Sequence, residues 1–133
     1  MANEWVKVEL YGANESGDPR RYTIATGTSV SKGQTLALAD NRTVVATTAT
    51  QAACAGVASE EHLANSGTSI SAWTNGLFRV IASGAISVGE GITFDSNNYV
   101  KRAVIATASG AMEAGYSLDT LADGDTGTVR LRL

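Results

Sequence analysis

A chain of 133 residues is long enough to bury one hydrophobic core, and 44% hydrophobic with 17% charged residues excludes an intrinsically disordered protein. Ten basic residues are scattered among thirteen acidic ones, a net charge of −3, which argues against a nucleic-acid partner because phosphate binding needs clustered Lys and Arg. The sequence has no run of about 18 apolar residues and no signal-peptide pattern at its start. We therefore expect that the protein is made in a cytoplasm and does not associate with a membrane.

The first predicted element lies within residues 1–12, which form either an arm or a first strand. From Trp5 to Leu10 apolar and polar side chains alternate with a period of two, which is typical of a β-strand with one apolar face. On this pattern Val6, Val8 and Leu10 share one face.

Residues 13–133 are predicted to form a single all-β domain. Fourteen glycines interrupt the chain at short intervals, often beside Asn, Asp, Ser or Thr, as turns between short strands require. The segment Ser59–Ala64 is the one place where a short helical turn is expected. The closing segment Thr128–Leu133 predicts a paired strand in which Val129, Leu131 and Leu133 face the core.

An internal repeat relates residues of about 22–74 to residues of about 78–133. Four positions of the first half align at constant spacing with four of the second: Val30, Gly33, Leu36 and Leu38 with Ile86, Gly89, Ile92 and Phe94. Two later segments also align, namely Ala55–Val57 with Ala114–Tyr116 and Gly67–Ile70 with Gly127–Arg130. Each unit is too small to be stable alone, so two units must bury their apolar faces together. The predicted fold is a compact β-barrel or β-sandwich built from two related halves, with at most one short helix.

Candidate catalytic and metal-binding residues are few. The single histidine, His62, lies beside two glutamates and is interpreted as a solvated surface residue, while Cys54 lies among small apolar residues and is expected to be buried. One Cys and one His are too few ligands for a zinc site, and Asp123–Gly127 lacks the further carboxylate of a calcium loop, so a plain turn is favoured. We expect no catalytic residue, no metal site, no cofactor and no enzymatic activity.

Five motifs, taken in their order along the chain, resemble small bacteriophage capsid decoration proteins, also called cement proteins. The motifs are Gly-x-x-Val-x-x-Gly-Gln-x-Leu at 27–36, Ala55–Ala58, Gly76–Val80, Ser83–Glu90 and Thr128–Leu133. The resemblance covers residues 26–133. It implies a structural virion protein that binds the outer surface of the major capsid protein shell as a homotrimer, stabilises the head, and is made in the host cytoplasm.

In such proteins an N-terminal arm often contacts the shell. The resemblance therefore makes Trp5, Val6, Val8 and Leu10 the candidate capsid-interface residues, with Trp5 as an aromatic anchor. The competing interpretation is that Val6, Val8 and Leu10 form a further core strand.

A different class, a non-catalytic ligand-binding or carrier module, also uses glycine turns of this type. Lipoyl and biotinyl carrier domains present a modifiable lysine at a hairpin tip, whereas the tips at Asp40–Thr43 and Ser96–Tyr99 contain no lysine. A sugar-binding module would favour exposed aromatic residues on one face, and here aromatic residues are only 6% and dispersed.

Overall fold

The computed structural model describes residues 3–10, 20–48, 53–64, 67–103 and 113–133. Within these ranges the chain forms eleven β-strands and one 3₁₀ turn, η1 (Ser96–Asn98), which confirms the all-β prediction. The strands are β1 (Val6–Leu10), β2 (Arg20–Ile24), β3 (Thr35–Asp40), β4 (Thr43–Ala46), β5 (Cys54–Ala58), β6 (Ser69–Trp73), β7 (Asn75–Ile81), β8 (Gly91–Phe94), β9 (Val100–Arg102), β10 (Gly115–Ser117) and β11 (Thr126–Arg132).

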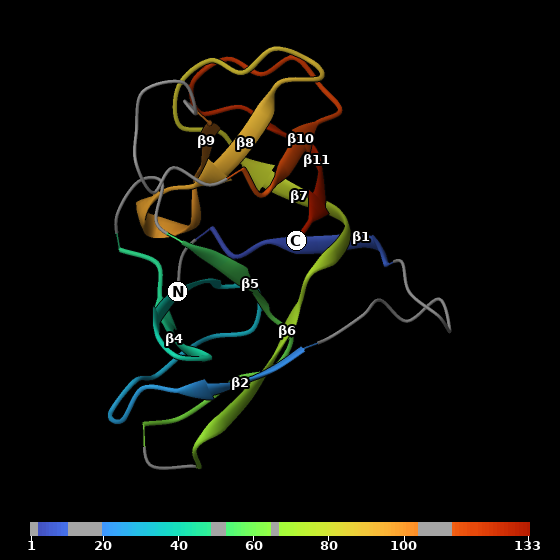
Figure 1. Cartoon of the computed structure of the whole chain (residues 1–133). Coiled ribbons are helices and arrows are strands. Elements are labelled where there is room, and N and C mark those ends of the chain that lie inside the picture. The colour runs from blue at the N-terminus through green and yellow to red at the C-terminus, as the bar shows by residue number, and fades with distance from the viewer. Residues whose placement is uncertain (1–2, 11–19, 49–52, 65–66, 104–112) are drawn as a thin grey trace.

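The strands form a closed barrel and a sheet. The barrel contains five strands in the order β2-β4-β3-β5-β6, and the sheet contains six in the order β1-β7-β11-β10-β8-β9. Figure 1 shows the barrel below the sheet, with the chain passing from β6 into β7 between them. Only one residue, Thr74, separates these two strands, so the two halves are directly connected.

The two halves share one scheme of strand pairing. The antiparallel pairs β2–β6, β3–β4, β3–β5 and β5–β6 of the barrel correspond to β7–β11, β8–β9, β8–β10 and β10–β11 of the sheet. The parallel contact between β2 and β4 has its counterpart in a single parallel bridge between Ala82 and Val100. The halves differ mainly in that β1 adds to β7 in the second half.

Register places most of the aligned residues at equivalent positions. Leu36 pairs with Gly56 in the barrel, and Ile92 pairs with Gly115 in the sheet. Both glycines are needed for close strand approach, because a Cβ atom would lie 2.7 Å from the Trp73 carbonyl oxygen at Gly56 and would overlap the backbone of β11 at Gly115. These positions explain why an Ala-Gly pair recurs in each half.

One part of the sequence alignment is wrong. Ala58 pairs with Ala72 in the barrel and Ser117 pairs with Val129 in the sheet, so Ala72 corresponds to Val129. The match of Gly67–Ile70 to Gly127–Arg130 is therefore displaced by three residues. Gly67 precedes β6, whereas Gly127 lies inside β11, and strand pairing rather than glycine content sets the register.

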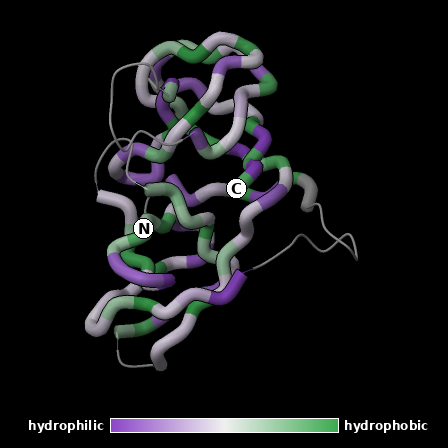
Figure 2. The backbone as a smooth tube through the Cα atoms, viewed as in Figure 1, coloured by the Kyte–Doolittle hydropathy of each residue, from purple (hydrophilic) through white to green (hydrophobic). Residues whose placement is uncertain are grey.

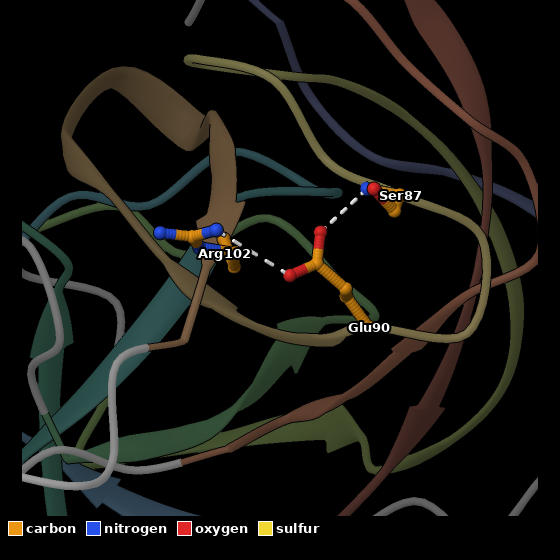
Figure 3. Close-up of polar contacts among 3 residues, drawn as sticks. All are labelled: Ser87, Glu90 and Arg102. Carbon is orange, nitrogen blue, oxygen red and sulfur yellow. Dashed lines mark hydrogen bonds and ion pairs between the residues drawn. The ribbon is translucent and has the colours of Figure 1, made fainter.

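A polar side chain closes the same turn in each half. The Gln34 side-chain oxygen accepts a hydrogen bond from the Ser31 backbone N–H at 3.1 Å, and the Glu90 carboxylate accepts one from the Ser87 N–H at 2.6 Å. In Figure 3 the Glu90 carboxylate also points toward Arg102, at an oxygen–nitrogen distance of 3.6 Å. The second half thus adds an ion pair that ties its turn to β9.

The hydrophobic core forms two clusters. One fills the sheet half and extends to Val57 and Trp73 of the barrel strands, and the other fills the barrel around Leu36 and Val44. Figure 2 shows hydrophobic residues distributed through both halves rather than gathered in one segment. The larger cluster therefore joins the two halves, which bury part of their apolar faces together.

The prediction for the C-terminal strand is confirmed. Val129 and Leu131 are fully buried and Leu133 packs against the core, while Arg132 on the opposite face is exposed. The alternation of apolar and polar residues in this segment therefore predicted correctly which face of the strand is buried.

The prediction of a helical turn at Ser59–Ala64 is wrong. His62 instead forms a β-bridge with Val30, exchanging hydrogen bonds of 2.8 and 2.9 Å between their backbone groups. A segment of six residues is too short to sustain a helix by itself, so tertiary pairing decides its conformation. The one helical turn in the described part is η1, where the Asp95 carboxylate caps the Ser96 N–H at 2.8 Å.

Candidate functional site

The structure places Trp5, the expected interface anchor, in the core. Its indole is only 3% exposed and contacts the rings of Phe78 and Phe94 at centroid distances of 5.7 and 5.2 Å. The indole N–H donates a hydrogen bond of 2.9 Å to the Asn98 carbonyl, and the Trp5 backbone N–H donates to the Gly33 carbonyl at 2.8 Å. Trp5 therefore attaches the N-terminal segment to both halves, and its ring does not lie on the surface.

The strand that follows Trp5 is exposed. Among the strands that the structure describes, β1 pairs only with β7, and it forms one edge of the six-stranded sheet. The register shifts between Lys7 and Glu9, and the side chains of Val6 and Val8 are 58% and 55% exposed. Their exposure contradicts the interpretation of these two valines as core residues. Leu10 pairs through its backbone with Gly76, and its side chain lies outside the described part of the structure.

A hollow of about 400 Å³ lies beside β1. It is lined by residues of the N-terminal segment together with Lys32 and Trp73. The Lys7 and Lys32 ammonium groups lie 5.5 and 5.7 Å from the centre of the Trp73 ring, within the range of cation–π attraction. We call the exposed side chains of Val6, Lys7, Val8 and Lys32 the β1 surface.

The β1 surface combines apolar and cationic groups. The valines expose hydrocarbon that a partner protein could cover, and the ammonium groups of the two lysines would attract carboxylates of that partner. The alternation of Trp5 to Leu10 indicated a strand here. It could not indicate which face is covered, because the core contacts of Trp5 come from residues more than 70 positions away.

His62 is buried, which corrects its interpretation as a solvated surface residue. The side chain lies with its ring nitrogens Nδ1 and Nε2 each 3.1 Å from a carbonyl oxygen, of Thr28 and Gly67 respectively. Its counterpart in the other half is Leu121, which forms the equivalent bridge with Ile86. The histidine thus occupies a position that a leucine fills in the sheet, and it holds two loops of the barrel together.

Cys54 is buried at 2% exposure, as the sequence indicated, with its Sγ atom 3.5 Å from the Thr93 hydroxyl. Burial raises the pKa of the Cys54 thiol, and hydrogen bonds from Phe94, from Thr93 and from its own backbone partly oppose this effect. The thiol is therefore held in its neutral, weakly reactive form.

The aspartates near residue 124 form the expected turn. The Asp125 carboxylate accepts a hydrogen bond from the Ala122 N–H at 3.0 Å, and the Asp123 carboxylate accepts one from the Gly84 N–H at 2.8 Å. Across the described ranges, no group of three or more His, Cys, Asp or Glu side chains is arranged to hold a metal ion. None of the helical segments described here has the length and apolar character to cross a membrane.

The fold is similar to that of a solved virion component. The head fiber gp8.5 N base of bacteriophage phi29 superimposes with a TM-score of 0.55, covering 86% of this chain and 94% of that one at 17% identity. At this identity the likeness shows the fold alone.

The family is established by a direct match of the sequence. A family model described as phage cement protein matches residues 15–133. No curated protein matches the chain. The chain belongs to the phage cement protein family and is a structural protein associated with the phage capsid. The resemblance to capsid decoration proteins drawn from the sequence motifs is thereby confirmed.

Proposed function

We propose that the protein decorates the outer surface of the shell formed by the major capsid protein and stabilises the head. Family membership supports a capsid partner, and the observation that points to a contact surface is the exposed β1 surface. A protein that binds the assembled shell but not its dissociated subunits shifts the equilibrium toward the intact particle. Many bound copies would add their individual contributions over the shell.

In this proposal residues 13–133 form one decoration domain and residues 1–12 supply the contact strand. Trp5 acts as a positioning residue, because its buried ring holds the strand in place while Val6 and Val8 face outward. The candidate interface thus consists of Val6 and Val8, with Leu10 kept from the sequence prediction and Lys7 and Lys32 added from the structure. The active species is a homotrimer, made in the host cytoplasm, that catalyses no reaction and holds no cofactor.

The proposal is tested with shells of the source phage that lack the protein. The purified protein is mixed with expanded shells and with unexpanded precursors, the shells are sedimented, and the bound copies are counted. Saturable binding to expanded shells in a whole-number ratio to capsomer sites, without binding to precursors, is the expected result. Absence of binding to either shell would contradict the decoration role. Analytical ultracentrifugation of the free protein tests the homotrimer.

A pair of matched variants tests the β1 surface. Val8→Glu places a charge on the exposed edge strand and should weaken shell binding at least tenfold. Val88→Glu is the control, because Val88 is 61% exposed and lies in the connection between β7 and β8, which Figure 1 shows at the opposite end of the sheet half from β1. Equal binding by both variants would exclude β1 from the interface.

A further inference from the structure

The six-stranded sheet has one buried face and one face toward solvent. In β7, β10 and β11 alternate side chains are buried, and the remaining residues of these strands are half-buried or exposed. The three strands are neighbours in the order β7-β11-β10 (Figure 1). Because successive side chains point to opposite sides of a strand, the residues between the buried ones share the second face of the sheet. This second face therefore lies on the surface of the protein.

Three arginines come together on this face. Arg79 belongs to β7, whereas Arg130 and Arg132 belong to β11. Arg79 pairs with Thr128, two positions before Arg130, so Arg79 and Arg130 are diagonal neighbours about 7–8 Å apart. Arg132 lies about 7 Å further along β11. Strand pairing thus gathers basic residues that are far apart in the sequence.

Neighbouring side chains hold two of the guanidinium groups against the sheet. The Arg130 Nη2 atom donates a hydrogen bond of 3.0 Å to the Asn75 side-chain oxygen. The Arg132 guanidinium lies 5.4 Å from the centre of the Tyr116 ring, within the range of cation–π attraction. Arg79 and Arg132 are exposed, and neither forms an ion pair with a carboxylate of the described residues. The charges of these two arginines can therefore pair with a partner.

The strands beneath this face carry no negative charge. β7, β10 and β11 contain no Asp or Glu, although acidic residues outnumber basic ones in the whole chain, thirteen to ten. Carboxylates stand at the borders of the three strands. Glu9 of β1 lies in register with Leu77, with its side chain outside the described part, and Glu113 lies against Gly91 of β8. The face between these borders is a local positive region of an acidic protein.

This face adjoins the candidate capsid interface. We call the side chains of Leu77, Arg79, Tyr116, Arg130 and Arg132 the arginine face. Val6 of the β1 surface pairs directly with Arg79, and directly paired residues share one face of an antiparallel sheet. The arginine face therefore continues the β1 surface onto β7 and β11. Arg and Tyr are enriched in protein interfaces, and a planar guanidinium can bind a carboxylate through two hydrogen bonds.

We infer that the arginine face is a second capsid contact, which binds an acidic surface of the shell protein. Carboxylates of the shell pair with the guanidinium groups of Arg79 and Arg132, and apolar groups beside them cover Leu77. The shell as the source of these carboxylates rests on the proposed function. The preference for a carboxylate partner rests on the charge and exposure of the face.

A peptide titration tests the carboxylate preference without any shell. The probe is acetyl-(Glu-Ala)₄-amide and the control is acetyl-(Lys-Ala)₄-amide, each added at low salt to ¹⁵N-labelled protein. The acidic peptide should shift the amide signals of Arg79 and Arg132 and leave those of Arg21 and Arg42 in the barrel unchanged.

Four results of this titration would overturn the inference. These are no shift, shifts as large at Arg21 and Arg42, equal shifts with the basic peptide, and equal shifts with a thymidine oligonucleotide. Shifts of Arg79 and Arg132 that follow the protein concentration alone would assign the face to a second copy of the chain, and would overturn it as well.

Charge-removing variants connect the face to the shell. The double variant Arg79→Gln with Arg132→Gln should bind expanded shells at least tenfold more weakly. The control, Arg21→Gln with Arg42→Gln, removes the same charge from exposed arginines of the barrel and should bind as the unchanged protein does. Because salt screens exposed charges, added NaCl should weaken shell binding by the unchanged protein more than binding by the first double variant.

The outcomes separate this inference from the decoration role. If both double variants bind shells as the unchanged protein does, the second contact is refuted and the decoration role stands. If the unchanged protein binds no shell but the acidic peptide shifts Arg79 and Arg132, the decoration role fails and the face is still supported as a site for acidic proteins.

Discussion

Replacement of Trp5 tests whether a core side chain holds the contact strand in place. An aromatic side chain that buries roughly 200 Å² at about 25 cal/mol per Å² stabilises a fold by about 5 kcal/mol at most. Core Phe or Trp to Ala changes cost about 3–5 kcal/mol, and the indole is 3% exposed. We expect Trp5→Ala to lower the free energy of unfolding by about 3–5 kcal/mol. Trp5→Phe should cost about 1–3 kcal/mol, because it removes the buried indole N–H that donates to the Asn98 carbonyl.

The assay is urea unfolding followed by far-ultraviolet circular dichroism, which does not depend on indole fluorescence. Val6→Ala is the matched control, since Val6 is the next residue, is 58% exposed and should change the free energy of unfolding by no more than about 0.5 kcal/mol. If Trp5→Ala is no more destabilising than Val6→Ala, the indole does not anchor the strand and the reasoning is refuted.

Three further predictions concern the core. Gly115→Ala should lower the free energy of unfolding by more than about 2 kcal/mol, because the new Cβ would overlap the Arg130 carbonyl, and urea unfolding measures this. His62→Ala should cost about 2–3 kcal/mol by removing the buried imidazole that lies between two loop carbonyls, while Leu63→Ala, at 70% exposure, should cost almost nothing. Because burial raises the pKa of the Cys54 thiol above 9.0, the stability linked to its neutral form is complete below pH 9 and declines as the pH rises further. Ellman's reagent should therefore react with Cys54 in urea and only slowly in the native protein. Rapid native reaction would show that the thiol is accessible.

Much of the fold was predictable because the alternation of apolar residues and the positions of glycines indicate strands and turns locally. The alternation of Thr128 to Leu133 identified a strand and its buried face, and the small neighbours of Cys54 indicated burial. Glycine spacing located the turns, so the all-β class was correct. The alignment failed only where a glycine inside β11 was matched to a glycine before β6.

The candidate interface was predictable only in part. The sequence singled out the segment from Trp5 to Leu10, and the structure shows Val6 and Val8 exposed on it. It could not indicate that Trp5 turns inward or that Lys32 lies over the Trp73 ring. These contacts join distant parts of the chain, and no local period encodes them.

By itself, then, the amino-acid order indicated the all-β class, the first and last strands and the family, since alternation, glycine positions and motif order are properties of the linear chain. The tertiary structure alone decided that His62 is buried and that β1 forms an exposed sheet edge. The physical reason is that burial and edge pairing depend on which strands meet in space. Which strands become neighbours depends on loop lengths and on packing between residues far apart in the sequence, in both halves of the chain.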